Sequence, residues 1–176
     1  MPTHRLIFLG GVHGTGKGVF CDQLCRSTPW EVLSASALIR WDEYAEDPKN
    51  KAVRSIPETQ ARLLAGLERE CKPGGRYLLD GHFTLLDAEN NVSRVDQAIF
   101  QAIAPEAILI KTENAEIVHE RLQQRDGKIY PIALIEGMLA EEATYSEELA
   151  RHLNVPYLVI APGQEAECIT AISTWK

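Results

Sequence analysis

The sequence predicts an α/β fold in which helices cover both faces of a parallel β-sheet. Four short apolar runs are continuous rather than alternating, as in strands that are buried on both faces. They cover residues 6–9, 77–79, 107–110 and 157–160, and residues 32–33 form a weaker fifth candidate. Stretches with helical signals separate these runs, so strand and helix alternate along the chain, which is typical of a parallel sheet.

Capping residues, prolines in first turns and apolar periodicity mark the helices between these strands. The predicted helices cover residues 18–26, 57–67, 112–122, 131–139 and 163–175. The break Pro73-Gly74-Gly75 ends the second of them before the next strand. Residues 41–55 are polar and contain Pro48 and Asn50, so we expect a loop with short turns that projects from the sheet.

Length and charge narrow the class of protein. The chain has 176 residues, which suits one domain with a sizeable core, and a net charge of -7, which disfavours binding to nucleic acids or anionic membranes. Residues 6–9 are too short for the core of a signal peptide, and no stretch approaches the roughly 18 apolar residues of a membrane helix. We therefore expect a cytoplasmic protein with no membrane partner.

A glycine-rich loop follows the first predicted strand. Its residues fit G-x-x-x-x-G-K, the Walker A pattern: Gly11, Val12, His13, Gly14, Thr15, Gly16 and Lys17. Glycines let backbone N–H groups turn inward around a phosphate, the helix that follows favours an anion at its start, and the lysine adds a full positive charge. The strand before the loop and the helix after it make this a specific signal for a P-loop that binds ATP or GTP.

The residues after the lysine depart from the usual pattern. Gly18 and Val19 stand where a serine or threonine hydroxyl would bind magnesium. We expect both residues to contact the nucleotide, and we expect Mg²⁺ to depend on phosphate oxygens, water and a carboxylate instead. The predicted cofactors are ATP and Mg²⁺.

Several motifs in the right order resemble those of adenylate kinases. The loop through Gly18 is similar to theirs, residues 33–40 resemble their acceptor-binding segment, residues 77–81 resemble their strand followed by Asp-Gly, and residues 120–125 resemble the start of their lid. The resemblance covers about residues 5–160 and is nearest to the compact archaeal and nuclear type, which has also been linked to ATPase activity. It implies a three-layer P-loop NTPase fold with a five-stranded parallel sheet of order 2-3-1-4-5. It also implies one domain over residues 1–176, with an acceptor-binding insertion at about 35–72 and a short lid at about 125–131.

Two differences from the adenylate kinase motifs affect the prediction of the acceptor. Ala35 and Ala37 stand where adenylate kinases carry threonine and aspartate, and residues 82–86 lack the arginine that many of them have after Asp-Gly. These changes leave the fold prediction intact but leave the acceptor unidentified.

The resemblance and the strand ends together nominate further site residues. Asp80 would face the phosphate loop and hold magnesium or orient the attacking group, with a strand-end turn as the alternative. Arg121 and Arg125 lie four residues apart and would clamp the transferred phosphoryl group, unless they pair with Glu120 or Glu116 on an exposed helix face. The predicted catalytic residues are Lys17, Asp80, Arg121 and Arg125.

Three residues are predicted to bind the acceptor. Ser34 and Arg40 lie in the segment that resembles the acceptor-binding helix, and His82 follows Asp-Gly at the sheet edge where ligands bind in open α/β sheets. A surface arginine and a structural histidine are the alternatives. We expect the His13 side chain to point away from phosphate, and the glutamates at 141, 142, 147 and 148 to form a solvated helix face.

The predicted function is a small-molecule kinase that transfers the γ-phosphoryl group of ATP to a nucleotide, nucleoside or other hydroxyl compound. The absence of a hydroxyl after Lys17 and of the acceptor arginine leaves a second hypothesis open, a P-loop ATPase or nucleotide switch that acts on a macromolecular partner. A nucleotide-binding module without turnover is a third. The fold cannot choose among the three.

Overall fold

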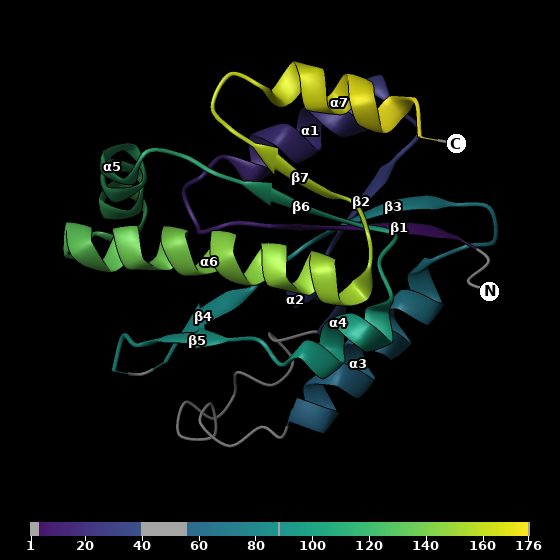
Figure 1. Ribbon diagram of the computed structural model, residues 1–176, viewed down its shortest axis with the longest axis horizontal. Helices are drawn as coiled ribbons and strands as arrows, with labels where there is room; N and C mark the ends of the chain where they lie inside the picture. Colours follow the sequence, from purple (N-terminus) through teal and green to yellow (C-terminus); the bar gives the residue numbers. More distant parts are fainter. Residues whose placement is uncertain (1–3, 40–55, 88, 176) are drawn as a thin grey trace.

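The computed structural model describes residues 4–39, 56–87 and 89–175. Its main sheet has five parallel strands in the order β2-β3-β1-β6-β7 (Figure 1). These strands are β1 (Arg5–Gly10), β2 (Glu31–Ser34), β3 (Arg76–Asp80), β6 (Ala107–Lys111) and β7 (Tyr157–Ile160). Counted within the sheet this is the predicted order 2-3-1-4-5, so the predicted fold class is confirmed. The weak candidate at residues 32–33 is the edge strand β2.

Helices cover both faces of the sheet (Figure 1). Helices α1 (Lys17–Ser27) and α7 (Glu165–Ser173) lie together above the sheet. Below it lie α3 (Ile56–Glu70), α4 (Gln97–Ile103) and α6 (Ile132–Leu153), while the short α2 (Ala35–Ile39) packs against α3 and α5 (Ala115–Asp126) packs against α6. This gives three layers with the sheet in the middle.

Alternate residues of the central strand β1 pack into the core on opposite faces of the sheet. Leu6 and Phe8 point to the α3, α4 and α6 side, while Ile7 and Leu9 point to the α1 and α7 side. All four are at most 4% exposed, because a strand with helices on both faces has no solvent side. The continuous apolar run of β1 follows from this burial.

Two elements were absent from the sequence prediction. After β3 the chain forms an antiparallel hairpin of β4 (Thr84–Leu86) and β5 (Val92–Arg94), and α4 follows it. Strands of three residues are too short to show alternation, and α4 ends on Ala104 in a left-handed conformation (φ 48) rather than on the glycine that usually marks a helix end. The predicted helices at 57–67 and 163–175 are present with shifted ends.

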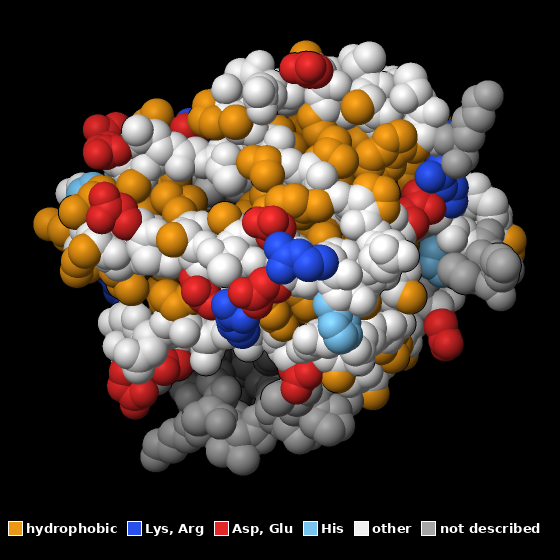
Figure 2. Space-filling view, in the orientation of Figure 1, with side chains coloured by type: hydrophobic (Ala, Val, Ile, Leu, Met, Phe, Trp, Pro, Cys, Tyr) orange, Lys and Arg blue, Asp and Glu red, His pale blue; other side chains and the backbone are white. Residues whose placement is uncertain are grey.

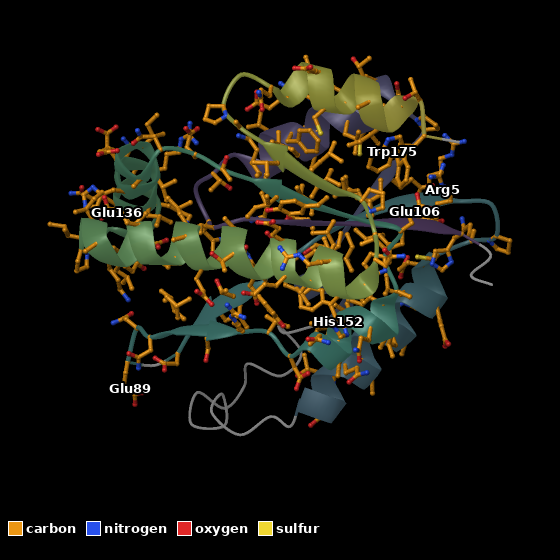
Figure 3. The ribbon with its side chains drawn as sticks, in the orientation of Figure 1. Arg5, Glu89, Glu106, Glu136, His152 and Trp175 are labelled. Atoms are coloured by element: carbon orange, nitrogen blue, oxygen red, sulfur yellow. The ribbon has the colours of Figure 1, made fainter. Side chains whose placement is uncertain are left out.

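The first and last parts of the described chain are joined where the strands of the sheet begin, at the opposite end from the phosphate loop. The guanidinium of Arg5 donates a 2.9 Å hydrogen bond to Glu106 and a 2.7 Å hydrogen bond to the carbonyl oxygen of Trp175 (Figure 3). The elements described here include no helix long and apolar enough to span a membrane.

Candidate active site

The phosphate loop takes a backbone conformation that its glycines permit. Gly11, Gly14 and Gly16 have φ values of 141°, 90° and 91°, in a region that other residues rarely adopt. A Cβ on Gly11 would also lie 2.5 Å from the carbonyl oxygen of Lys111 on the neighbouring strand β6. The loop passes from β1 into α1, whose first residue is Lys17. The start of α1 therefore offers N–H groups and a positive dipole end at the place where a phosphate would bind.

Lys17 is held inside the loop rather than in solvent. Its ammonium donates a 2.7 Å hydrogen bond to the carbonyl oxygen of Gly11 and lies 3.9 Å from the Asp80 carboxylate. The residue is 8% exposed, so its charge is buried within the loop. Burial lowers the pKa of Lys17 from its ordinary value of 10.5, and attraction to Asp80 opposes that shift.

Asp80 ends β3 beside the central strand, where it pairs with Leu9 in the parallel register. Burial raises the pKa of its carboxyl, and the nearby Lys17 opposes the rise. Burial thus works against the charged form of both partners, and the attraction across 3.9 Å offsets part of that cost. Among the described residues the buried Oδ1 of Asp80 has no hydrogen-bond partner, and such an orphaned carboxylate oxygen fits a magnesium ligand or a bound water.

Asp80 would need help from the nucleotide to hold a metal. Within the described ranges, no three His, Cys, Asp or Glu side chains gather in a way that could hold a metal ion. Phosphate oxygens and water would have to complete the coordination, as the missing hydroxyl at Gly18 and Val19 also requires.

His82 is tied to the phosphate loop. Its Nδ1 lies 2.9 Å from the carbonyl oxygen of Gly11, and because a carbonyl only accepts, Nδ1 carries the proton and donates. The His13 ring lies against it with ring centroids 4.2 Å apart. Burial, with Lys17 as the next cause, lowers the pKa of His82 to about 3 and that of His13 to about 4, so both rings are neutral at neutral pH.

The two predicted clamp arginines differ in position. Arg121 donates a 2.7 Å hydrogen bond to the carbonyl oxygen of Gly14, approaches Glu113 at 3.4 Å and lines the cavity described below. Arg125 instead makes a bidentate pair with its neighbour Asp126, at 2.5 and 2.8 Å, and lies outside the cavity lining. Arg125 therefore does pair with an acidic neighbour, although the partner is Asp126 rather than Glu116 or Glu120, and the catalytic roles of both arginines stay predictions.

A cavity of about 990 Å³ brings most of the predicted residues together. Its wall includes loop residues 12–19, Ser34, Asp80, His82 and Arg121. His13 is among them, and the expectation that its side chain points away from phosphate stays a prediction. Arg40 and residues 41–55 lie outside the described residues, so the predicted role of Arg40 stays a prediction, as do the insertion at 35–72 and the lid at 125–131.

Sequence reasoning missed a second lysine in the site. Lys111 ends β6, is 2% exposed, pairs with Glu165 at 3.1 Å and lines the same cavity. A Cβ on Gly16 would lie 4.0 Å from the Lys111 side chain, so this cation stands beside the start of α1. Its position directly after a buried apolar run was a usable signal, because the ends of parallel strands meet at the edge where ligands bind.

Glu142 corrects the prediction of a solvated glutamate face. Its side chain is 1% exposed, and Oε1 accepts hydrogen bonds from the backbone N–H groups of Phe83 (3.0 Å) and Thr84 (2.6 Å) and from the Thr84 hydroxyl (2.9 Å). Glutamates 141, 147 and 148 do lie on the outside. Arg94 of β5 pairs with Glu141 and Glu148, and Arg151 of α6 pairs with Glu147. Figure 2 shows acidic and basic side chains next to one another across the middle of this face of the molecule.

A comparison with protein families identifies the chain at the level of its domain. Residues 10–135, which hold the phosphate loop, Asp80 and Arg121, match the family described as "AAA domain". The chain belongs to this AAA domain family. No curated protein sequence matches this AAA domain protein.

Three solved structures that are similar to this chain carry the word kinase in their titles. A shikimate kinase from Acinetobacter baumannii in complex with shikimate is similar with a TM-score of 0.56 and 16% identity, over 97% of this chain and 91% of that one. A gluconokinase from Sinorhizobium meliloti 1021 gives 0.53 and 14%, over 96% and 89%. An unliganded sugar kinase from Janibacter sp. HTCC2649 gives 0.56 and 17%, over 98% and 94%. This AAA domain therefore has the fold of small P-loop kinases, while its nearness to adenylate kinases stays a prediction.

Proposed function

We propose that this protein is an ATP-dependent phosphotransferase that acts on a small molecule. One observation carries the proposal. The cavity lined by phosphate loop residues 12–19 continues past Asp80 and His82 to the side chains of α3 and α4, so one cavity has room for a nucleotide and a second substrate. The titles of the similar structures add support, because each of those proteins is called a kinase.

The proposed chemistry is positioning and charge stabilisation. Loop N–H groups at the start of α1 would hold the phosphates, and Lys17 would exchange its bond to the Gly11 carbonyl for a phosphate oxygen. Arg121, already anchored on the Gly14 carbonyl, would neutralise charge that develops on the transferred group. The acceptor oxygen bonds to the γ-phosphorus as the bond between that phosphorus and ADP breaks, and the hydroxyl proton is released to water.

Asp80 is the residue proposed to hold magnesium. Bound Mg²⁺ would neutralise charge on the phosphate oxygens. The free Oδ1 of Asp80 gives the carboxylate one oxygen for the metal or its water, while Lys17 stays within 3.9 Å to balance the carboxylate charge. His82 and Ser34 are proposed to face the acceptor from the ends of neighbouring strands.

Release of ADP tests this function. The purified chain is incubated with Mg²⁺-ATP, alone and with each of a panel of hydroxyl compounds, and ADP is measured in a coupled assay. Release that depends on one acceptor, together with a phosphorylated product, supports the kinase. Release at the same rate with and without every compound contradicts it.

One observation favours a second candidate, a P-loop ATPase that acts on a macromolecular partner. Gly18 and Val19 offer no side-chain ligand for magnesium beside the loop lysine, and Val19 is 63% exposed at the cavity. Acceptor-independent ADP release that a bound protein accelerates would support this candidate.

A further inference from the structure

The two ends of the cavity differ in charge. At the phosphate loop end the wall carries charges of both signs: the cations Lys17, Lys111 and Arg121, and the carboxylates of Asp80, Glu165 and Glu113 that lie next to them. At the other end the wall is built by apolar side chains from β1, α3 and α4 and from the turn before α4. They are Phe8, Leu63, Val95, Ile99, Phe100 and Ile103. Among the described residues that line this end, none is a lysine or arginine.

The apolar chamber begins beside the residues proposed for chemistry. A Cβ on Gly81 would lie 2.7 Å from the Phe8 ring and 3.4 Å from the Ala35 side chain, so glycine between Asp80 and His82 brings the backbone directly onto the apolar wall. The Val95 N–H donates a 2.9 Å hydrogen bond to the Phe83 carbonyl oxygen. The Tyr145 hydroxyl donates a 2.7 Å hydrogen bond to the Val95 carbonyl oxygen. The wall is therefore fixed to the strand end.

An exposed leucine extends this apolar surface to the cavity mouth. Leu85, on β4, is 53% exposed and lines the cavity. A large apolar side chain that is open to solvent at a cavity is well placed to cover an apolar ligand. The polar groups at this end are neutral: the hydroxyls of Ser34, Ser36 and Thr59, and the ring of His82.

These observations, together with the proposed function on which the inference rests, point to a class of acceptor. We infer that the second substrate is an uncharged hydroxyl compound with a flat apolar face, of the nucleoside class, rather than a nucleotide or a sugar acid. Its apolar face packs against the exposed Leu85 side chain at the apolar end of the cavity, and its hydroxyl lies near His82.

Charge and hydrogen bonding both favour this class. A phosphate or carboxylate placed against the apolar wall would lose its water without gaining a cation from the described lining, and this loss of hydration disfavours a charged acceptor. His82 offers a hydroxyl a neutral acceptor, because Nδ1–H is used on the Gly11 carbonyl and no described residue pairs with Nε2.

A substrate panel tests the inference. ADP release is measured with adenosine, uridine and thymidine, with their 5′-monophosphates, with shikimate and gluconate, and with glucose as an uncharged compound without an apolar face. We expect stimulation by at least one nucleoside and none by the charged compounds or glucose. Stimulation by a monophosphate or sugar acid alone would overturn the acceptor class and leave the kinase standing.

Calorimetry distinguishes a failure of the proposed kinase function from a failure of the inferred acceptor class. Each compound is titrated into the chain saturated with a nonhydrolysable ATP analogue. Nucleoside binding without ADP release would overturn the proposed function but support the acceptor class. If no nucleoside binds, the acceptor class is wrong whatever the kinase assay shows.

A matched pair of variants locates the site. Leu85→Asn removes the apolar contact at the cavity mouth and should weaken nucleoside affinity about tenfold. Val159→Asn is the control, because Val159 is a similarly exposed apolar residue on strand β7 (49%) away from the cavity. Equal affinities in both variants would remove Leu85 from the acceptor site.

Discussion

Glu142 accepts two hydrogen bonds from Thr84, one from its backbone N–H at 2.6 Å and one from its hydroxyl at 2.9 Å. The contact joins the middle of α6 to the first residue of β4, 58 residues away in the chain. It lies just after Asp80, Gly81 and His82. A carboxylate from the longest helix thus fixes the segment that carries the candidate acceptor residues.

Removal of this carboxylate should destabilise the fold. In Glu142→Ala the N–H groups of Phe83 and Thr84 and the Thr84 hydroxyl lose their acceptor while they stay buried, at about 1–3 kcal/mol for each unpaired group. Urea denaturation measures the loss. Glu141→Ala is the control, since its partly exposed pair with Arg94 contributes about 0–1 kcal/mol. Equal losses in the two variants would contradict the anchoring role of Glu142.

The sheet and the phosphate loop could be predicted because their signals are local. Residues 6–9 are apolar without a break since both faces of β1 are covered, and glycines follow where φ is positive. The strand order was available only through the resemblance to adenylate kinases, because spacing alone does not say which strands are neighbours. The predicted site residues Lys17, Asp80 and His82 lie together because all three follow from strand ends that meet at one edge.

Other features depend on contacts between distant residues. Glu142 sits among surface glutamates in the sequence, and only the fold shows that it meets buried N–H groups of residues 83 and 84. The place of Lys111 in the site follows from its contacts with Gly16 and Glu165, which lie far from it in the chain. The strands of the β4–β5 hairpin have three residues each, which is too short for an alternating apolar pattern to predict them.

Lys17→Met should weaken ATP binding by at least about tenfold, because it removes the cation that the loop directs toward the phosphates while it keeps an apolar stem of similar length. Isothermal titration calorimetry gives the affinity, and Lys72→Met, an exposed lysine outside the cavity, is the control. Unchanged ATP affinity in Lys17→Met would remove the phosphate loop from the proposal.

Asp80→Asn should keep ATP binding but lose turnover that depends on magnesium. The amide preserves the shape of the side chain, while the oxygen that now lacks a hydrogen-bond partner becomes part of a neutral group and a poorer metal ligand. ADP release is measured across a magnesium titration, together with ATP affinity. A wild-type rate at limiting magnesium would make Asp80 a structural residue at the end of β3.

Substitution of Arg121 and of Arg125 should change the rate of ADP release by different amounts. Arg121 lines the cavity and is held on the Gly14 carbonyl oxygen, so Arg121→Ala should lower the rate of ADP release about tenfold to a hundredfold. Arg125 is paired with Asp126 outside the lining, so Arg125→Ala should have the smaller effect. The reverse order would show that residues 125–131 rearrange over the phosphates when the nucleotide binds.

The pH dependence of stability should single out Glu142. Burial raises the pKa of its carboxyl above the ordinary value of 4.5, and hydrogen bonds from Thr84 and attraction to Lys17 only partly oppose that rise. Above pH 4.5 the unfolded chain releases this proton while the folded chain retains it longer. The contribution to stability is therefore complete below pH 4.5 and is lost as the pH rises through the folded pKa. Glu142→Gln cannot titrate and keeps an oxygen for the Phe83 and Thr84 donors. Measured by urea denaturation at pH 5 and pH 7.5, its stability relative to the wild-type chain should increase at the higher pH. A difference that stays constant would mean that Glu142 has the same pKa in the folded and unfolded states.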